Sequence, residues 1–248
     1  MLGAGASAPF GFPLGRNWSK QIYNGLSGSA QPLAGMLHNT LGHDYAILDR
    51  FHKELYFSGK NSIDAFLEHR REYEQLGKAV IAATLIPHET DAIFGYAADN
   101  WLRYTYEKLD TGFEEFGDNF GDNKVSFITF NYDRVIEWFF VTALSNSYHR
   151  SKRDCAAVLK SIPIIHLHGR LGYLPWETSS DKQTWFDPAV TKDALDACVN
   201  EIKIIYEDIS DGRDSEFARA KELLDNAERV YILGFGFSSY KCWKIRTE

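Results

Sequence analysis

The chain has 248 residues, of which 44% are hydrophobic and 15% aromatic, and its formal net charge is −7 at pH 7. This apolar content is sufficient for a buried core and excludes global disorder. The negative charge argues against a dedicated nucleic-acid-binding protein. Because no run of about 18 apolar residues and no signal-peptide pattern occurs, we expect a cytoplasmic protein without a membrane span. The cysteines are scattered without a C-x-x-C pair, so neither a zinc site nor a disulfide framework is expected: Cys155, Cys198 and Cys242.

A glycine-rich turn begins two residues from the N-terminus and reads Gly3-Ala4-Gly5-Ala6-Ser7. Glycines at such a turn let backbone N–H groups approach a phosphate where a Cβ atom would clash. The spacing is close to the dinucleotide-binding fingerprint, which also requires a preceding strand and a following helix. Only Met1 and Leu2 precede the turn, so we expect the first strand to be missing and an unpaired sheet edge in its place. The pattern predicts a nucleotide ligand, in a chain that looks truncated at both termini.

After this turn, helical spacing dominates the first half of the chain. Residues 61–83 carry apolar side chains on one side, and Asn61 with Asp64 offers an N-cap arrangement. A second helix is expected over residues 100–109, followed by a glycine- and acid-rich loop. We interpret residues 40–120 as a helical insertion that covers a cleft within a single domain spanning residues 1–248.

Four short apolar runs rich in β-branched and aromatic residues read as strands, and each stops at a polar or glycine cluster. They are residues 125–130, 163–167, 202–206 and 229–233. Helical patterns at residues 135–140 and 217–224 alternate with them. The alternation predicts an α/β fold with an open, mostly parallel, Rossmann-like sheet and helices on both faces. In such sheets, ligands bind outside the carboxyl ends of the strands.

The side chains that could carry chemistry follow these strand ends. Asn131 and Asp133 alternate, so both point to one side, where they could bind ribose hydroxyls, a carboxamide or a water. Both are also ordinary caps for the helix that follows. His168 lies just past the second strand and is a candidate proton acceptor from a sugar hydroxyl. His166 lies deeper, so we interpret it as a hydrogen-bonded core histidine, and the H-x-H spacing lacks a third metal ligand.

Together these motifs resemble the sirtuin family. The opening glycine turn followed by Gly11-Phe12-Pro13-Leu14-Gly15-Arg16 looks like the sirtuin opening, and Phe130-Asn131-Tyr132-Asp133 looks like its T-x-N-x-D strand end. His168-Gly169 is similar to the catalytic H-G pair, and Gly234-Phe235-Gly236-Phe237-Ser238 to the late glycine turn. The order of motifs is similar along essentially the whole chain, most closely to the zinc-free prokaryotic branch of sirtuin-like proteins.

The resemblance implies NAD as a substrate, attacked at the nicotinamide–ribose bond. It assigns the pyrophosphate to Gly3, Ala4, Gly5 and Ser7, with Arg16 reaching toward phosphate or ribose. Asn131 would position the ribose or the attacking water, Asp133 the carboxamide or a hydroxyl, and His168 would act as general base. Gly234, Gly236 and Ser238 would line the adenosine end.

The departures from the family favour hydrolysis over deacylation. The chain cannot supply the four-cysteine zinc module of the deacylases, and Leu14-Gly15 replaces the segment whose phenylalanine shields the reacting ribose. We therefore expect an NAD glycohydrolase (NADase) without a metal, and the resemblance implies an antiphage defence effector that depletes NAD. Two alternatives remain open, a non-catalytic nucleotide-sensing module of a larger assembly and a zinc-free deacylase. The trigger, and whether the partner is another protein or a second copy of the chain, also stay open.

Overall fold

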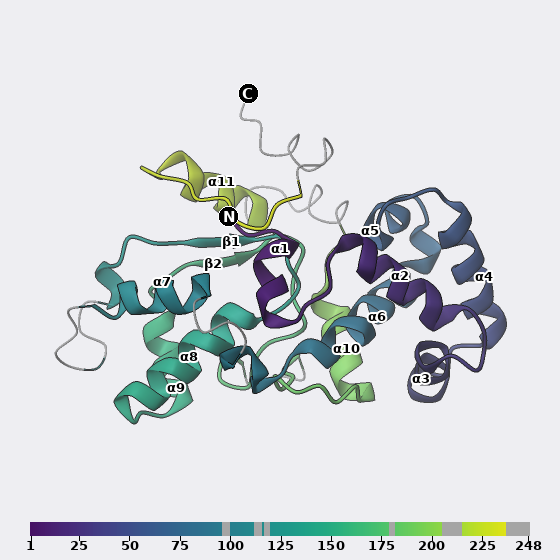
Figure 1. Ribbon diagram of the computed structural model, residues 1–248, viewed down its shortest axis with the longest axis horizontal. Helices are drawn as coiled ribbons and strands as arrows, with labels where there is room; N and C mark the ends of the chain where they lie inside the picture. The colour runs from purple at the N-terminus through teal and green to yellow at the C-terminus, as the bar shows by residue number, and fades with distance from the viewer. Residues whose placement is uncertain (96–99, 112–115, 117–119, 179–181, 205–214, 237–248) are drawn as a thin grey trace.

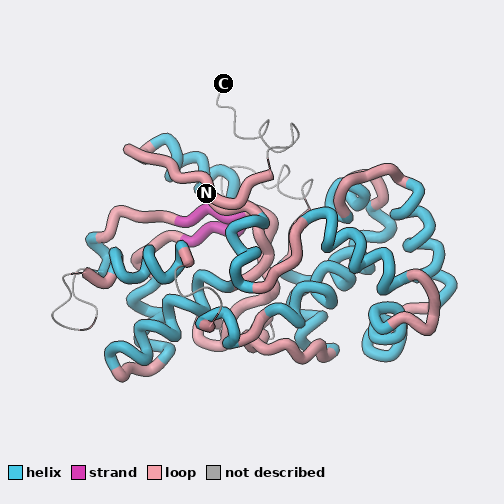
Figure 2. Tube along the Cα trace, in the orientation of Figure 1, coloured by secondary structure: helices cyan, strands magenta, loops and turns pink. Residues whose placement is uncertain are grey.

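The computed structural model describes residues 1–95, 100–111, 116, 120–178, 182–204 and 215–236, except for the side chain of Arg16. Figure 1 shows two groups of elements, one built around a small sheet and one made of helices. The two strands and the loops that follow them stand out in Figure 2. No helix in these ranges is both long and apolar enough to cross a bilayer.

The sheet contains two strands that pair in parallel, β1 (Phe127–Thr129) and β2 (Ile164–His166). Phe127 lies opposite Ile164, and Thr129 lies opposite His166. Both strands fall within the runs predicted from the sequence, and they are joined through helices, as parallel pairing requires. The described chain is therefore mostly helical with a small parallel sheet, which agrees with the expected α/β class.

The N-terminal residues extend this sheet on the far side of β1. Leu2 forms parallel bridges with Thr129 and with Leu233. Its N–H donates to the Ile128 carbonyl oxygen at 2.8 Å, and its own carbonyl oxygen accepts from the Phe130 N–H at 3.0 Å. The spatial order is thus β2, β1, Leu2, Leu233. The expectation of an unpaired edge before Gly3 is wrong, because two residues are enough to occupy that place.

The other two predicted strands are reduced to single bridges. In the run 229–233, only Leu233 pairs, receiving a hydrogen bond at its carbonyl oxygen from the Gly3 N–H at 2.9 Å. In the run 202–206, Ile202 pairs antiparallel with Gly169, and residues 205–206 lie outside the described ranges. Ile202 directly follows a helix that ends at Glu201. This helix, and not pairing with β2, therefore sets the direction of the chain at Ile202.

Helices cover both faces of the sheet. One face carries Ile128, Phe130, Ile165 and Leu167, which pack with Ala220 of α11 (Glu216–Asp225). On the other face, Phe127 contacts Phe140 of α8 (Val135–Tyr148), with ring centroids 5.7 Å apart. The alternation of side chains along a strand explains this division, because successive residues point to opposite faces. Next to α8 lie α7 (Trp101–Leu109) and α9 (Lys152–Leu159).

The second group consists of helices that pack on one another. They are α2 (Gly15–Leu26), α3 (Pro32–Leu41), α4 (Tyr45–Phe57), α5 (Ile63–Leu67), α6 (Glu74–Leu85) and α10 (Lys192–Glu201). This group starts before residue 40, and α7 packs on α8 instead, so its limits differ from the expected 40–120. The expected helix over 61–83 is divided into α5 and α6. Its N-cap is Ser62, whose hydroxyl accepts from the Ala65 N–H at 3.2 Å, rather than Asn61.

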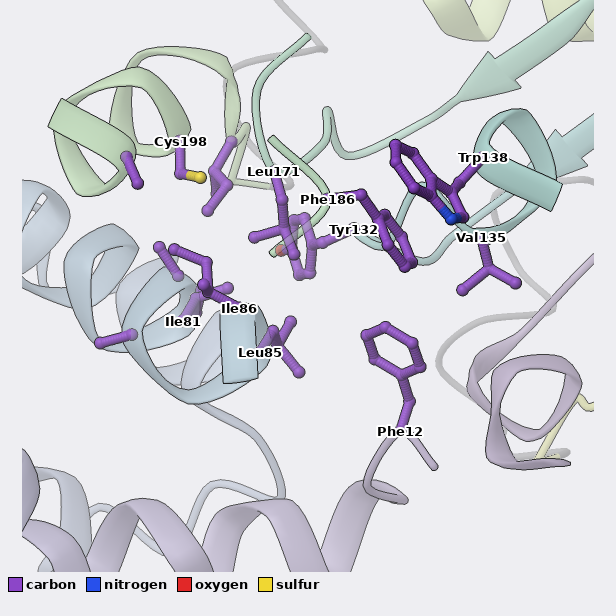
Figure 3. Close-up of a cluster of buried hydrophobic side chains, with 14 of the residues drawn as sticks. Phe12, Ile81, Leu85, Ile86, Tyr132, Val135, Trp138, Leu171, Phe186 and Cys198 are labelled. Atoms are coloured by element: carbon purple, nitrogen blue, oxygen red, sulfur yellow. The ribbon is translucent and has the colours of Figure 1, made fainter. Parts of the chain in front are cut away.

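The two groups pack together through one cluster of buried apolar side chains, to which both contribute residues. Figure 3 shows Ile81 and Leu85 of α6 on the side of Tyr132, which follows β1, and Val135 at the start of α8 on the other side of the same cluster. These four side chains are buried. The strand end that carries the polar candidate residues is therefore held between the sheet and the helical group.

Candidate functional site

The glycine turn is in contact with the backbone around Gly234. The Gly5 N–H donates to the Gly234 carbonyl oxygen at 2.8 Å. A Cβ atom on Gly3 would lie 2.8 Å from the Gly234 oxygen, and one on Gly5 would lie 2.8 Å from the Gly234 Cα. Gly234 itself has a φ of +68°. The glycines therefore allow two distant segments of backbone to touch, which the sequence analysis had not assigned to them.

Asn131 is fixed at this junction by four hydrogen bonds. Its side-chain Nδ2 donates to the Gly3 carbonyl oxygen at 3.0 Å and to the Ser7 hydroxyl at 2.8 Å. Its main-chain N–H donates to the Thr129 hydroxyl at 3.0 Å, and its carbonyl oxygen lies 3.1 Å from Nδ1 of His166. Among the described residues, none donates to Oδ1 of Asn131. Both amide hydrogens are thus used, and Oδ1 remains as an acceptor.

Asp133 is linked to Asn131 through Ser7. The Ser7 hydroxyl donates to Oδ2 of Asp133 at 2.7 Å while it accepts from Asn131, and both Ser7 and Asp133 are buried. The Val135 N–H approaches Oδ1 of Asp133 at 3.4 Å, so the capping role is present but long. Burial raises the pKa of Asp133 to about 6, although the Ser7 hydrogen bond and His166 act in the opposite direction.

His168 is buried at the turn that follows β2. Its ring lies edge-on to Phe130, with centroids 5.6 Å apart, and to Phe217 of α11 at 6.0 Å. The turn needs a glycine after the histidine, because Gly169 has a φ of +69° and a Cβ there would lie 1.8 Å from the Glu201 carbonyl oxygen. Phe130, which contacts the His168 ring, directly precedes Asn131 in the chain.

Apart from His168, the predicted residues thus divide into three sets. The structure brings together Gly3, Gly5, Ser7, Asn131, Asp133 and Gly234. Ala4 lies exposed within the same turn in α1 (Ala4–Ser7), Gly236 is exposed two residues past Gly234, and Arg16 lies in the first turn of α2. Ser238 lies outside the described ranges.

Two buried ionisable side chains, His166 and Glu137, lie next to this cluster and form a hydrogen bond with each other. His166 is a buried, hydrogen-bonded histidine as predicted, with Nε2 2.8 Å from Oε1 of Glu137. Glu137 was not recognised as a site residue. It follows Asp133 by four positions, so helical spacing brings it to the same side, and an acid within an otherwise apolar helix needs a partner.

Arg134, which directly follows Asp133, connects the segment after β1 to Glu89 and to the main chain at Thr184 and Trp185. Its guanidinium is fully buried and pairs with Glu89, and it donates to the carbonyl oxygens of Thr184 at 2.8 Å and Trp185 at 2.9 Å. Burial acts against the charged form, but Glu89 outweighs it and the pKa of Arg134 is raised. The segment 131–134 is therefore fixed by polar contacts to both groups of elements.

We expect Asp133→Asn to change how stability depends on pH. A carboxyl group with its pKa raised from 3.8 to about 6 stabilises the fold while protonated, below about pH 4, and this stabilisation is lost as the pH rises through 6. Asparagine keeps an acceptor for Ser7 but does not ionise. Relative to wild type, the variant should gain on the order of 2 kcal/mol between pH 4 and pH 7, measured by urea unfolding. Asp193→Asn, at an exposed position in α10, is the control. A constant difference across this range would contradict the burial argument.

Two surface hollows lie away from this cluster. One of about 390 Å³ is lined by residues of α4 and α5, including Phe57 and Phe66. The other, of about 570 Å³, lies between α7 and α8 and includes Arg103 and Thr142. In the described part of the chain, no group of three His, Cys, Asp or Glu side chains is arranged to hold a metal ion.

Comparisons with protein-family models, curated proteins and solved structures found no match for this chain.

Proposed function

We propose that this chain is a sirtuin-like NAD glycohydrolase that cleaves the bond between nicotinamide and ribose. The observation that carries the proposal is the fixed Asn131 amide, which joins the glycine turn to Asp133 and leaves Oδ1 as an acceptor. Catalysis of bond cleavage depends strongly on such positioning, since small displacements of a reacting group cost large factors in rate.

The arrangement of the extended segments supports a nucleotide ligand at this place. In chain order, the segments around Leu2, β1, β2 and Leu233 are first, second, third and fourth, and their spatial order is third, second, first, fourth. Rossmann-like sheets have the same order, and in them the ligand binds where the direction of winding reverses, between the first and fourth segments. The contact between the glycine turn and Gly234 lies at that point.

We assign the parts of NAD to residues from these contacts and, for Arg16, Gly236 and Ser238, from the family resemblance. The Gly3 and Gly5 N–H groups already donate to Leu233 and Gly234, so pyrophosphate binding falls to the Ala4 N–H and Arg16. Asn131 Oδ1 accepts from a ribose hydroxyl or the attacking water. Asp133, as a carboxylate above about pH 6, accepts from the carboxamide of nicotinamide. Gly236 and Ser238 belong to the adenosine end.

The chemistry requires little from the protein beyond position and charge. Nicotinamide leaves NAD as a neutral group from a cationic one, so its departure needs no proton donor, and the developing positive charge on the ribose is stabilised by nearby acceptors. We assign proton removal from the ribose or water to His168. The biological consequence that we propose is depletion of NAD by a defence effector.

The test is incubation of the purified protein with NAD, followed by separation of the products. The wild type should release nicotinamide together with ADP-ribose, and a cyclic product would indicate cyclisation instead of hydrolysis. His168→Ala should lower the rate by about 100-fold or more. His69→Ala, an exposed histidine of the helical group, is the matched control and should keep the wild-type rate.

One observation favours a second candidate, a nucleotide-sensing module without catalysis. His168 is only 8% exposed and lies against two aromatic rings, which suits a structural role. Tight NAD binding by calorimetry without nicotinamide release would favour this module. Release that requires an acylated peptide would indicate a deacylase, and absence of NAD binding would refute both nucleotide assignments.

A further inference from the structure

The proposed cleavage does not yet use His166, although it is the side chain that meets the main chain of Asn131. Its Nδ1 lies 3.1 Å from the Asn131 carbonyl oxygen, and its Nε2 lies 2.8 Å from Oε1 of Glu137. His166 and Glu137 are both buried. Burying an ionisable pair costs free energy unless good hydrogen-bond geometry offsets the loss of solvation. This pair is buried in direct contact with the main chain of Asn131.

The partners of the two ring nitrogens determine where the hydrogens are. A carbonyl oxygen can only accept, so Nδ1 must carry a hydrogen for Asn131. A carboxylate also can only accept, so Nε2 must carry one for Glu137. The guanidinium of Arg170 lies 3.6 Å from the same Oε1 and favours the carboxylate form of Glu137. With Glu137 as a carboxylate, both ring nitrogens donate and the ring is an imidazolium.

We propose that His166 is a positioning residue of the site, which holds the Asn131 carbonyl as a doubly donating imidazolium kept charged by Glu137. The link to NAD cleavage rests on the proposed function, whereas the charge state of His166 does not. The main chain of Asn131 is then fixed by His166 and its amide by Gly3 and Ser7. Together these contacts determine the direction of Oδ1.

The surrounding charges agree with this arrangement. Burial lowers the pKa of His166, but Glu137 outweighs burial and the net shift is upward. The pKa of Glu137 is lowered, since His166 and then Arg170 outweigh its burial. The other charged groups that act on this pair and on Asp133 are Arg170 after β2 and Glu89 near α6, and Glu89 is itself paired with Arg134.

The charge of His166 also acts on Asp133. Its positive charge lowers the pKa of Asp133 and so opposes the effect of burial. Removing that charge should make Asp133 harder to ionise. Glu137 would then influence, through His166, the pH at which Asp133 becomes an acceptor.

The experiment compares Glu137→Gln with wild type by nitrogen and carbon NMR. Glutamine has the same length and can still pair with Nε2, so the contact is kept while the charge is lost. Wild-type His166 should show two protonated ring nitrogens at neutral pH. In Glu137→Gln, His166 should titrate at lower pH, and the titration of the Asp133 carboxyl should move upward. Thermal unfolding verifies that each variant is folded.

A second pair of variants tests the positioning of Asn131 itself. His166→Asn places an amide N–H near the position of Nδ1, whereas His166→Leu has similar volume and no donor. His166→Asn should retain at least about tenfold more nicotinamide release than His166→Leu, with the loss in kcat rather than KM. The controls are His38→Asn, where Nδ1 also meets a main-chain oxygen at 2.8 Å but in the helical group, and Glu74→Gln, which pairs with Lys78.

The outcomes separate this inference from the proposed function. A neutral wild-type His166 at pH 7, or an unchanged Asp133 titration in Glu137→Gln, would overturn the inference even if the protein cleaves NAD. Equal release by His166→Asn and His166→Leu would overturn the positioning role. If NMR shows the imidazolium and the shift of Asp133 but no NAD is cleaved, the charge relation stands and the proposed function fails.

Discussion

Replacing Asn131 with alanine is expected to reduce nicotinamide release by at least about 100-fold. The substitution removes Oδ1, the acceptor that we assign to the ribose or water, and it removes the donor that holds the Ser7 hydroxyl at 2.8 Å. Ser7 would then be free to rotate away from Asp133. The loss should appear mainly in kcat, because the pyrophosphate and adenosine contacts are made elsewhere.

Two further variants give this experiment its contrast. Asn146→Ala removes an exposed asparagine in α8 and should leave the rate unchanged. Ser7→Ala breaks the link between Asn131 and Asp133 but keeps Oδ1, so its rate should lie between those of Asn131→Ala and wild type. Nicotinamide release by Asn131→Ala at the wild-type rate would show that the cleavage site lies elsewhere.

The second large effect is expected for Gly234→Ala, which should destabilise the protein by at least about 3 kcal/mol. Alanine is strained at a φ of +68°, and its Cβ would lie 1.9 Å from the Ala6 backbone nitrogen. Because the backbones of Ala6 and Gly234 are both held by hydrogen bonds, neither can move without separating the glycine turn from the segment around Leu233. Urea unfolding measures the loss.

The matched control is Gly35→Ala in α3. A Cβ there would meet nothing within 4 Å, and its φ is not in the left-handed region. We expect this variant to be neutral or to stabilise the protein by up to about 1 kcal/mol, since alanine favours a helix over glycine. Similar unfolding midpoints for the two variants would show that the backbone contact at Gly234 contributes little.

Local pattern was sufficient to predict the elements with strong hydrophobic periodicity. β1, β2 and α11 lie within or around the predicted runs, and α7 begins at Trp101 with Asn100 as its cap. Their apolar residues are dense and their neighbours are polar, so the sequence alone determines where they begin. The end of the first strand run at Asn131 was likewise predicted from residue types.

Long-range pairing was not predictable in this way. Leu2 forms a sheet position through hydrogen bonds to Ile128 and Phe130, and two residues give no periodicity to recognise. Ile202 belongs to a run that resembles a strand, but α10 delivers it antiparallel to Gly169. In both places the partner lies far away in the sequence, so it decides the structure and local propensity does not.

The candidate site shows the same division. The sequence indicated that Asn131, Asp133 and the glycine turn would meet at strand ends, and the contacts through Ser7 bring them together. The sequence did not indicate the pair formed by His166 and Glu137 next to them, because this pair depends on the burial of Glu137 and on the orientation of the His166 ring. Buried polar partners are determined by packing, which a single sequence does not display.

The pairing of Leu2 with Leu233 has a consequence for the order of folding. During synthesis at about 5–20 residues per second, helices such as α2 to α6 can form while the glycine turn still lacks its partner. The turn is completed only after Gly234 has been made and has left the ribosome. Since contacts so distant in sequence slow folding, we expect the contact between the glycine turn and Gly234 to be the last part of the molecule to form. A nascent chain would therefore carry a formed helical group before the proposed nucleotide site is complete.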